Sequence, residues 1–192
     1  MQQINDFKAI ANELIPQLNN IPFKHMLNTS GIINYAEEAQ FEMVRLGIGL
    51  YGFGNDQKET SKLKNVLTLK SVISQIHTIE KGESLGYNRS YIAETTTKTA
   101  TIPIGHADGI SRQFGKGKGF VYINNKKAPI VGNVCMDVIM VNITNITCNE
   151  GDEVIIYRDQ QHIEEIAKSA NTIPYELLTA ISQRVKRVLK KC

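Results

Sequence analysis

The sequence predicts a mainly β domain at residues 56–192, preceded by a shorter α/β segment at residues 1–55. Two patterns support this prediction. Beyond residue 64, short β-rich segments alternate with turns that contain glycine, asparagine or aspartate, which is typical of an antiparallel sheet or barrel. Before residue 55, the order strand, loop, helix, strand is typical of an α/β arrangement, because parallel strands need a crossover between them.

The α/β segment opens with apolar side chains at helical spacing over residues 3–18, which predicts an amphipathic helix. Pro16 should kink or shorten the last turn of this helix, because its ring cannot continue the helical hydrogen bonds. The remaining predicted elements are a strand at 22–27, a loop at 28–31 that could cap a helix, a polar helical stretch at 35–41 and an apolar run at 44–53 as the second strand.

A polar linker at residues 55–64 separates this segment from the β domain. The predicted strands of that domain lie within residues 66–79, 97–104, 120–123, 128–131, 138–143 and 154–157. One helix is predicted at residues 162–171, between the last of these strands and the final segment of the chain.

The composition limits what the chain can be. With 42% hydrophobic residues among 192, it can bury a core, which excludes intrinsic disorder as its main state. No apolar run approaches the roughly 20 residues of a membrane-spanning helix, and the first residues lack a secretory signal pattern. The three cysteines and four histidines show no metal-ligand spacing, so we expect a cytoplasmic protein without disulfides or a metal site.

The net charge of +3 depends on the segment 184–191, which carries five positive charges and no negative one. Without this segment the net charge would be five lower, at −2. A nucleic-acid-binding domain spreads its basic residues over a face, often with aromatic residues between them. The segment is therefore interpreted as a solvated strand or helix end, and neither nucleic acid nor a membrane is expected as a partner.

A glycine-rich stretch at residues 115–119 (GKGKG) has two interpretations. Glycines let backbone N–H groups approach an anion, which is how a phosphate cradle forms. The simpler interpretation is a hairpin turn between two strands, and we favour it because no helix start follows. The residues by themselves therefore indicate a β-rich domain and no particular reaction.

Six segments, taken together in their order along the chain, are more informative than any one of them. They are HMLNTSG (25–31), MVRLGIGLYG (43–52), GESLGY (82–87), IGHADG (104–109), PIVGNVCMD (129–137), and TIPYE (172–176) followed by ISQRV (181–185). In this order the segments resemble the alanine racemase family, and they span nearly the whole chain.

The resemblance implies a fold-type III enzyme that uses pyridoxal 5′-phosphate (PLP) to interconvert L-alanine and D-alanine for peptidoglycan precursors. Members of the family have an N-terminal TIM-like (β/α)8 barrel and a β-rich, barrel-like C-terminal domain, and they act as head-to-tail homodimers with shared active sites. Residues 1–55 would be the C-terminal end of the PLP-binding barrel, and residues 56–192 the C-terminal domain. PLP supplies the electron sink, and the protein supplies orientation and two opposed bases, a PLP-binding lysine and a tyrosine of the partner subunit.

Three residues of the β domain receive roles in catalysis, substrate binding or the gate from the resemblance. Tyr87 resembles the tyrosine base, although by itself it would be interpreted as a strand-end tyrosine with its hydroxyl in water. Met136 resembles the residue whose backbone N–H meets the alanine carboxylate, whereas its side chain alone suggests a core methionine. His106 stands where the family usually has tyrosine at the inner gate, so we expect a more open, pH-sensitive gate, because histidine can become charged near neutral pH.

The PLP-binding residues are also implied by the resemblance. Arg45 resembles the arginine that donates to the PLP ring nitrogen, and it cannot hand over a proton because a guanidinium is essentially never deprotonated. His25 resembles the residue that orients this arginine. For the PLP phosphate, the resemblance implies a hydroxyl, two backbone N–H groups and a tyrosine hydroxyl, supplied by Thr29, Gly47, Ile48 and Tyr175.

The largest departure from the family is that its PLP-binding lysine has no counterpart in this sequence. The carboxylate-binding arginine of the early barrel and the histidine that supports the tyrosine are missing too, and Lys24 matches no family lysine. We therefore expect a C-terminal fragment that needs the missing N-terminal barrel half and is inactive alone. The alternative is a non-catalytic dimerisation or PLP-binding module from a truncated or degenerate racemase.

Overall fold

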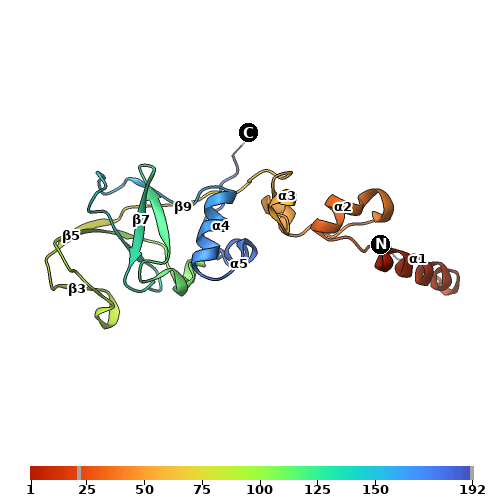
Figure 1. Cartoon of the computed structure of the whole chain (residues 1–192), viewed down its shortest axis with the longest axis horizontal. Coiled ribbons are helices and arrows are strands. Elements are labelled where there is room, and N and C mark those ends of the chain that lie inside the picture. Colours follow the sequence, from red (N-terminus) through yellow and green to blue (C-terminus); the bar gives the residue numbers. More distant parts are fainter. Residues whose placement is uncertain (21–22, 191–192) are drawn as a thin grey trace. The chain divides into compact units, whose positions relative to one another are not determined.

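The first unit of the chain is mostly helical. The computed structural model describes residues 1–20 and 23–190, and these form two compact units divided between Val66 and Leu67. The helices of the first unit are α1 (Gln2–Leu14), η1 (Ile15–Gln17), α2 (Thr29–Ala39), η2 (Ile48–Tyr51) and α3 (Gln57–Thr60) (Figure 1). The first predicted helix is confirmed, and Pro16 shortens it as expected, because the turn after Leu14 continues as a 3-10 helix.

Helix α2 begins at a side-chain cap. The Asn28 Oδ1 accepts a hydrogen bond from the Gly31 N–H at 3.0 Å, which satisfies one of the free donors at the helix start. The prediction of a capping loop at 28–31 is therefore right about the cap and wrong about the extent of the loop, because the helix already begins at Thr29.

The two strands predicted for this unit do not form as strands. Residue 22 lies outside the described residues, and of the rest only His25 pairs, through one parallel bridge to Met43. The apolar run at 44–53 turns through η2 instead, and Gly52 leaves it with a φ of 89°. A parallel strand needs neighbours with which to form hydrogen bonds. Within the described residues of this unit, each of the two predicted strands has only the other as a neighbour for pairing.

The predicted linker at 55–64 contains an ordered carboxylate. Glu59 of α3 is buried and accepts hydrogen bonds from Ser30 Oγ at 2.5 Å, Asn34 Nδ2 at 2.6 Å and the Asn55 N–H at 2.9 Å. The bond from Ser30, followed by that from Asn55, holds the pKa of Glu59 below its ordinary value. These contacts tie α3 to α2.

The second unit is built on a seven-stranded sheet in the order β1-β9-β6-β7-β8-β5-β2, in which all pairs are antiparallel. The strands are β1 (Leu69–Val72), β2 (Gln75–Ile79), β5 (Thr97–Ile102), β6 (Phe120–Ile123), β7 (Lys126–Val131), β8 (Ile139–Asn142) and β9 (Glu153–Tyr157). Each predicted strand segment overlaps at least one of these strands, so the mainly β class is confirmed.

The sheet has a barrel-like closure because its two outermost strands are consecutive in the chain. Strand β1 pairs with β9 and β2 pairs with β5, and only Ile73 and Ser74 separate β1 from β2. The Ile73 N–H donates to the Asp152 carbonyl at 3.0 Å, and the Ser74 N–H donates to the Thr101 carbonyl at 2.9 Å. The single predicted strand at 66–79 is therefore two strands, and its bend carries the chain from one end of the strand order to the other.

Short elements surround this sheet. The hairpin of β3 (Ser84–Leu85) and β4 (Tyr91–Ile92), with η3 (Tyr87–Arg89) at its tip, is not predicted by the sequence, and neither is α5 (Pro174–Thr179). Helix α4 (Gln160–Ser169) confirms the predicted helix and lies beside α5 (Figure 1). Two 3-10 turns, η4 (His106–Asp108) and η5 (Arg112–Phe114), follow β5.

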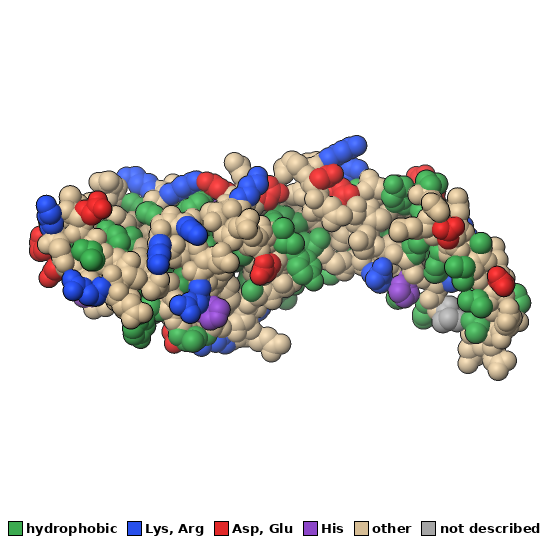
Figure 2. Space-filling view, turned by 60° about the horizontal axis from the view of Figure 1, so that its bottom comes forward, with side chains coloured by type: hydrophobic (Ala, Val, Ile, Leu, Met, Phe, Trp, Pro, Cys, Tyr) green, Lys and Arg blue, Asp and Glu red, His purple; other side chains and the backbone are tan. Residues whose placement is uncertain are grey.

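The basic segment at 184–190 is irregular, so the prediction of a strand or helix end is wrong for it. Arg187 is engaged with the backbone and donates to the carbonyls of Ser182, Val185 and Ile181. Figure 2 shows acidic and basic side chains interspersed over the face in view. In the described parts of the chain, no helix combines the length and apolar character needed to cross a membrane.

Candidate functional site

Thr29 and the glycine-rich run after it form a compact group of hydrogen-bonding atoms in the first unit. The Thr29 side chain is buried at the start of α2, and its Oγ1 accepts hydrogen bonds from the Gly47 N–H at 3.2 Å and the Gly49 N–H at 3.1 Å. Both bonds use the oxygen as acceptor, so its O–H is left to donate elsewhere. Among the described residues, the Ile48 N–H has no partner. One hydroxyl, of Thr29, and one amide, of Ile48, are thus available in this group to bind an anion.

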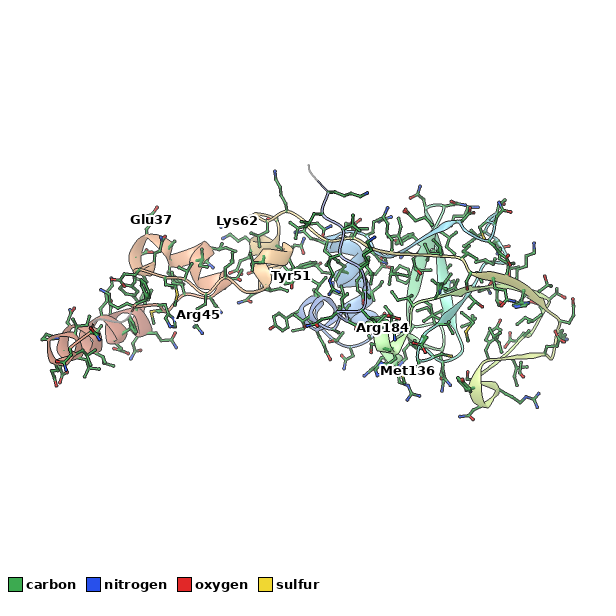
Figure 3. All side chains as sticks on the ribbon, turned by 180° about the vertical axis from the view of Figure 1, so that it is seen from behind. Glu37, Arg45, Tyr51, Lys62, Met136 and Arg184 are labelled. Carbon is green, nitrogen blue, oxygen red and sulfur yellow. The ribbon has the colours of Figure 1, made fainter. Side chains whose placement is uncertain are left out.

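Arg45 and His25 lie next to this group in the same unit. The Arg45 N–H donates to the Leu27 carbonyl at 2.8 Å, and its Nη2 donates to the Met26 carbonyl at 3.2 Å. Arg45, labelled in Figure 3, and His25 are both exposed. No hydrogen bond joins them within the described residues, so the Met26 carbonyl is the group that holds the guanidinium. A cavity of about 400 Å³ begins here, lined among others by Met26, Asn28, Ser30, Tyr35, Arg45 and Asn55.

Tyr87 sits at the tip of the β3–β4 hairpin in the second unit. Its side chain is 74% exposed, and three of its neighbours, Gly86, Asn88 and Arg89, have φ values of 75°, 57° and 50°. A run of left-handed residues is unfavourable for side chains other than glycine, so packing must hold the turn. Ser90 provides this anchor, because its Oγ accepts a hydrogen bond from the Asn133 N–H at 3.1 Å.

Met136 and His106 lie on two loops of the second unit that are bonded to each other. The His106 N–H donates to the Cys135 carbonyl and the Ala107 N–H donates to the Met136 carbonyl, both at 2.9 Å. Gly105 packs so closely that a β-carbon there would lie 2.5 Å from the Met136 oxygen. Met136 is 60% exposed, so the interpretation of its side chain as a core methionine is wrong. Within the described residues its N–H has no partner.

Arg184 joins the same two loops through their carboxylates. Its Nε lies 2.7 Å and its Nη2 3.3 Å from the two oxygens of Asp108, and Nη2 also lies 2.5 Å from Asp137 Oδ1. Asp108 is buried and also accepts the Gly105 N–H at 2.8 Å. Burial alone would raise the pKa of Asp108, but the Arg184 guanidinium and the Gly105 N–H bring it below its ordinary value.

His106 and Tyr175 are both exposed at the surface of this unit. The His106 Nδ1 lies 3.4 Å from the Ile110 carbonyl, and the ring borders a cavity of about 360 Å³. That cavity is also lined by Ser111, Asn171 and Glu176. Tyr175 is 52% exposed in the first turn of α5. The proposed roles of both residues in a gate and in phosphate binding stay predictions.

The glycine-rich stretch at 115–119 is a turn that precedes β6, with no strand immediately before it, and its amides are occupied. The N–H groups of Lys116, Gly117, Lys118 and Gly119 donate to carbonyls of Gly132, Ile130, Gly115 and Phe114. A phosphate cradle needs N–H groups that are free to face an anion, so the cradle interpretation is wrong. The stretch is a turn, but the favoured hairpin between two strands is wrong too, because η5 and not a strand precedes it. In the described part of the chain, no cluster of histidine, cysteine, aspartate and glutamate could hold a metal ion.

The predicted site residues therefore fall into two groups, one in each unit. Thr29, Arg45, Gly47, Ile48 and His25 lie in the first unit, and Tyr87, His106, Met136 and Tyr175 lie in the second.

Sequence reasoning assigned no role to three residues that support these groups. Gly49 leaves room for Thr29, since a β-carbon at Gly49 would lie 2.8 Å from Thr29 Cγ2. Ser90 anchors the Tyr87 turn, and Arg184 joins the His106 and Met136 loops. Arg184 lies in ISQRV (181–185), a segment that resembles the family, and this resemblance was the signal that could have drawn attention to it.

Comparisons with known proteins match both units. The family model described as alanine racemase, N-terminal domain, matches residues 1–54, and the model described as alanine racemase, C-terminal domain, matches residues 66–189. The alanine racemase of Helicobacter pylori (strain P12) is 39% identical over 197 residues, which cover 97% of this chain and 52% of that protein. The chain thus spans about half the length of the curated relatives it matches.

Solved structures agree with the sequence comparison. The alanine racemase of D-cycloserine-producing Streptomyces lavendulae matches with a TM-score of 0.85 and 28% identity, over 99% of this chain and 52% of that one. The alanine racemase of Bartonella henselae, solved with covalently bound pyridoxal phosphate, matches with a TM-score of 0.78 and 34% identity, over 97% of this chain and 51% of that one.

Proposed function

The chain belongs to the alanine racemase family, and on that premise we propose that it forms the C-terminal half of a PLP-dependent racemase acting on L- and D-alanine. The observation that carries the proposal is that models of both family domains match, in family order, along one chain. The chain spans about half the length of its relatives. We propose that the site residues it does not contain, including a PLP-binding lysine, belong to the family's N-terminal barrel half.

The first unit offers donors that suit a phosphate group. The Thr29 O–H and the Ile48 N–H are free of partners within the described residues, whereas the Gly47 N–H already donates to Thr29 Oγ1. Arg45 is exposed and held by the Met26 carbonyl, so its remaining N–H groups can donate to a ring nitrogen. Bound PLP supplies an electron sink for the carbanion at the α-carbon of alanine. The protein's part is to hold that cofactor and to move protons.

Tyr87 is proposed as the group that takes and returns the proton on one face of alanine. A general base must reach its substrate, and Tyr87 projects from a turn that Ser90 anchors, with 74% of its side chain exposed. In isolation such a tyrosine is only a surface residue. Its place in a GESLGY segment of an alanine racemase domain supports a role in the active site of a partner subunit, in a head-to-tail homodimer.

Met136 is proposed to bind the alanine carboxylate through its backbone. Its N–H has no partner within the described residues, while its carbonyl is fixed by the Ala107 N–H. A backbone N–H held in a fixed direction is well suited to a carboxylate, because a charge-assisted hydrogen bond is about twice as strong as a neutral one.

The proposal is tested by mixing purified chain with a separately produced N-terminal barrel half and measuring conversion of L-alanine to D-alanine with added PLP. We expect no turnover by the chain alone, turnover by the mixture, and a loss of about 10²–10⁴-fold in kcat for Tyr87→Phe. The control is Tyr91→Phe in β4, which removes a hydroxyl from the same hairpin.

Two results would overturn parts of this proposal. Turnover by the chain alone would show that it needs no separate lysine-bearing half. PLP binding by a mixture that does not racemise alanine would favour a non-catalytic PLP-binding or dimerisation module.

A further inference from the structure

We propose that Arg184 is a positioning residue that locks the Met136 loop to the His106 loop and so fixes the direction of the Met136 N–H. The part of this proposal that concerns alanine rests on the function proposed above. The part that concerns the two loops stands on the geometry of this chain. Arg184 itself touches neither a substrate nor a cofactor.

The first argument is convergence from three distant segments. Asp108 lies 76 residues from Arg184 in sequence, and Asp137 lies 47 residues from it. All three residues stand in segments that resemble the family, yet that resemblance assigns none of them a function. Figure 3 shows Arg184 and Met136 close to each other in the second unit, and the ion pair to the adjacent Asp137 confirms the proximity.

The second argument is that the contact between Arg184 and Asp108 differs from an ordinary surface ion pair. An exposed pair contributes little, because water and salt screen it. The Asp108 side chain is only 11% exposed, however, and both of its oxygens face the guanidinium fork of Arg184. A planar fork that meets a carboxylate with two N–H groups fixes direction as well as distance. Loss of Arg184 would leave a buried carboxylate with the Gly105 N–H as its remaining strong donor.

The third argument is that the backbone transmits this constraint to Met136. Asp108 Oδ2 holds the Gly105 N–H at 2.8 Å, and Gly105 packs directly against the backbone of residues 135–137. The next two N–H groups, of His106 and Ala107, donate to the carbonyls of Cys135 and Met136. The two loops are therefore joined through their backbones, and Arg184 contacts one carboxylate on each of them.

The C-terminal segment contributes a second contact that keeps Arg184 in place. The Ser182 N–H donates to the Asp108 carbonyl at 3.0 Å, two residues before the arginine. Arg187 fixes the same segment through three backbone carbonyls. These hydrogen bonds fix the irregular segment that carries Arg184 beside the loops. This basic stretch is therefore not simply solvated.

The test compares Arg184→Gln, which removes the charge, with Arg184→Lys, which keeps the charge but loses the fork. Lys186→Gln is the matched control, since it removes an exposed charge two residues away. Amide hydrogen exchange by NMR on the 192-residue chain reads the His106 and Ala107 N–H groups, which bond the two loops. The Val141 N–H in the sheet reports global stability.

We expect exchange at His106 and Ala107 to become at least tenfold faster in Arg184→Gln, faster to a smaller extent in Arg184→Lys, and unchanged in Lys186→Gln. The Val141 rate should change far less. Equal protection of His106 and Ala107 in the wild-type chain and Arg184→Gln would overturn the proposal. So would a uniform acceleration of all three amides, because it would indicate a general loss of stability.

The consequence for alanine is read in the mixture with the barrel half. We expect Arg184→Gln to raise KM for alanine about tenfold, with a smaller change in kcat, because a misdirected N–H weakens carboxylate binding. An unchanged KM with faster loop exchange would overturn the link to the substrate. If the wild-type mixture does not racemise alanine, the proposed function fails, while the exchange rates still decide whether Arg184 locks the loops.

Discussion

Gly105 faces the carbonyl oxygen of Met136 across a gap that admits no side chain, since a β-carbon on Gly105 would lie 2.5 Å from that oxygen and 2.7 Å from the Asp137 nitrogen. The backbone of Gly105 is extended, with φ −149°, so left-handed geometry is not what requires glycine here. Glycine is required because two backbones approach each other closely at Gly105. This close packing joins the loops that carry His106 and Met136.

We therefore expect Gly105→Ala to destabilise the chain by about 1–3 kcal/mol, as overpacking does in a region that cannot yield. The measurement is the shift of the urea unfolding midpoint. Gly151→Ala is the comparison for backbone strain without overpacking, because Gly151 has φ 90° and open space around its α-carbon. It should lose about 1–2 kcal/mol through that strain. A wild-type midpoint in Gly105→Ala would mean that the loops separate easily.

The β domain could be predicted largely from sequence because its strands are short apolar runs bounded by turn residues. Residues 120–123 are predicted and observed as the same strand, with Tyr122 and Ile123 buried in it. The bend at Ile73 and Ser74 was missed, because an apolar run does not show where the chain changes its pairing partner. Only the hydrogen bonds to two different strands reveal it.

Other sequence-based predictions failed for one physical reason: the residues whose contacts determine the local structure are distant in sequence. The run at 44–53 has the composition of a strand, but the single bridge in this region of the described residues joins His25 to Met43, just before the run. Arg184 looked like part of a solvated basic end, because Asp108 and Asp137 are far from it along the chain. For the candidate site, residue identities came from family resemblance, whereas the supports at Gly49, Ser90 and Arg184 became visible only in three dimensions.

His162 makes the stability of the β domain sensitive to acid. The residue is 1% exposed, and its ring contacts Phe120 and Tyr122 at centroid distances of 5.2 and 4.6 Å. Its Nδ1 accepts the Arg158 N–H at 3.2 Å, and among the described residues its Nε2 has no partner. Burial, followed by the positive charge of Arg158, lowers the pKa of His162 to about 4.

Because this pKa lies below the ordinary value of 6.5, the unfolded chain binds the proton more tightly than the folded one. The stability from neutral His162 is therefore fully present above pH 6.5 and declines by about 3 kcal/mol as the pH falls to 4. Urea unfolding between pH 7 and 4 measures the slope. We expect the slope to shrink in His162→Phe and to persist in His77→Asn, which changes an exposed histidine. Equal slopes in both variants would refute this assignment.

Thr29 should support the loop at 47–49 whether or not PLP is bound. Its Oγ1 accepts the N–H groups of Gly47 and Gly49, so Thr29→Val leaves two donors without their acceptor in almost the same volume. We expect a loss of about 1–3 kcal/mol from the first unit and faster exchange of both glycine amides by NMR. Thr29→Ser retains the oxygen and should restore both properties. Wild-type exchange rates in Thr29→Val would contradict the contact.

Ser90 should control how rigidly the Tyr87 turn is held. The Ser90 Oγ accepts the Asn133 N–H, and Gly132 has φ 68°, where a β-carbon would lie 3.1 Å from the same oxygen. Without this bond, the left-handed residues Asn88 and Arg89 lose the contact that compensates their strain. We expect Ser90→Ala to speed cleavage by trypsin after Arg89 several-fold, because a protease needs a turn that opens. Ser84→Ala in β3 is the control on the same hairpin, since Ser84 is exposed there.

In the mixture with the barrel half, Ser90→Ala should also lower kcat for alanine, because a mobile turn presents Tyr87 in the reactive position less often. Faster cleavage with full kcat would separate the rigidity of the turn from the proposed role of Tyr87.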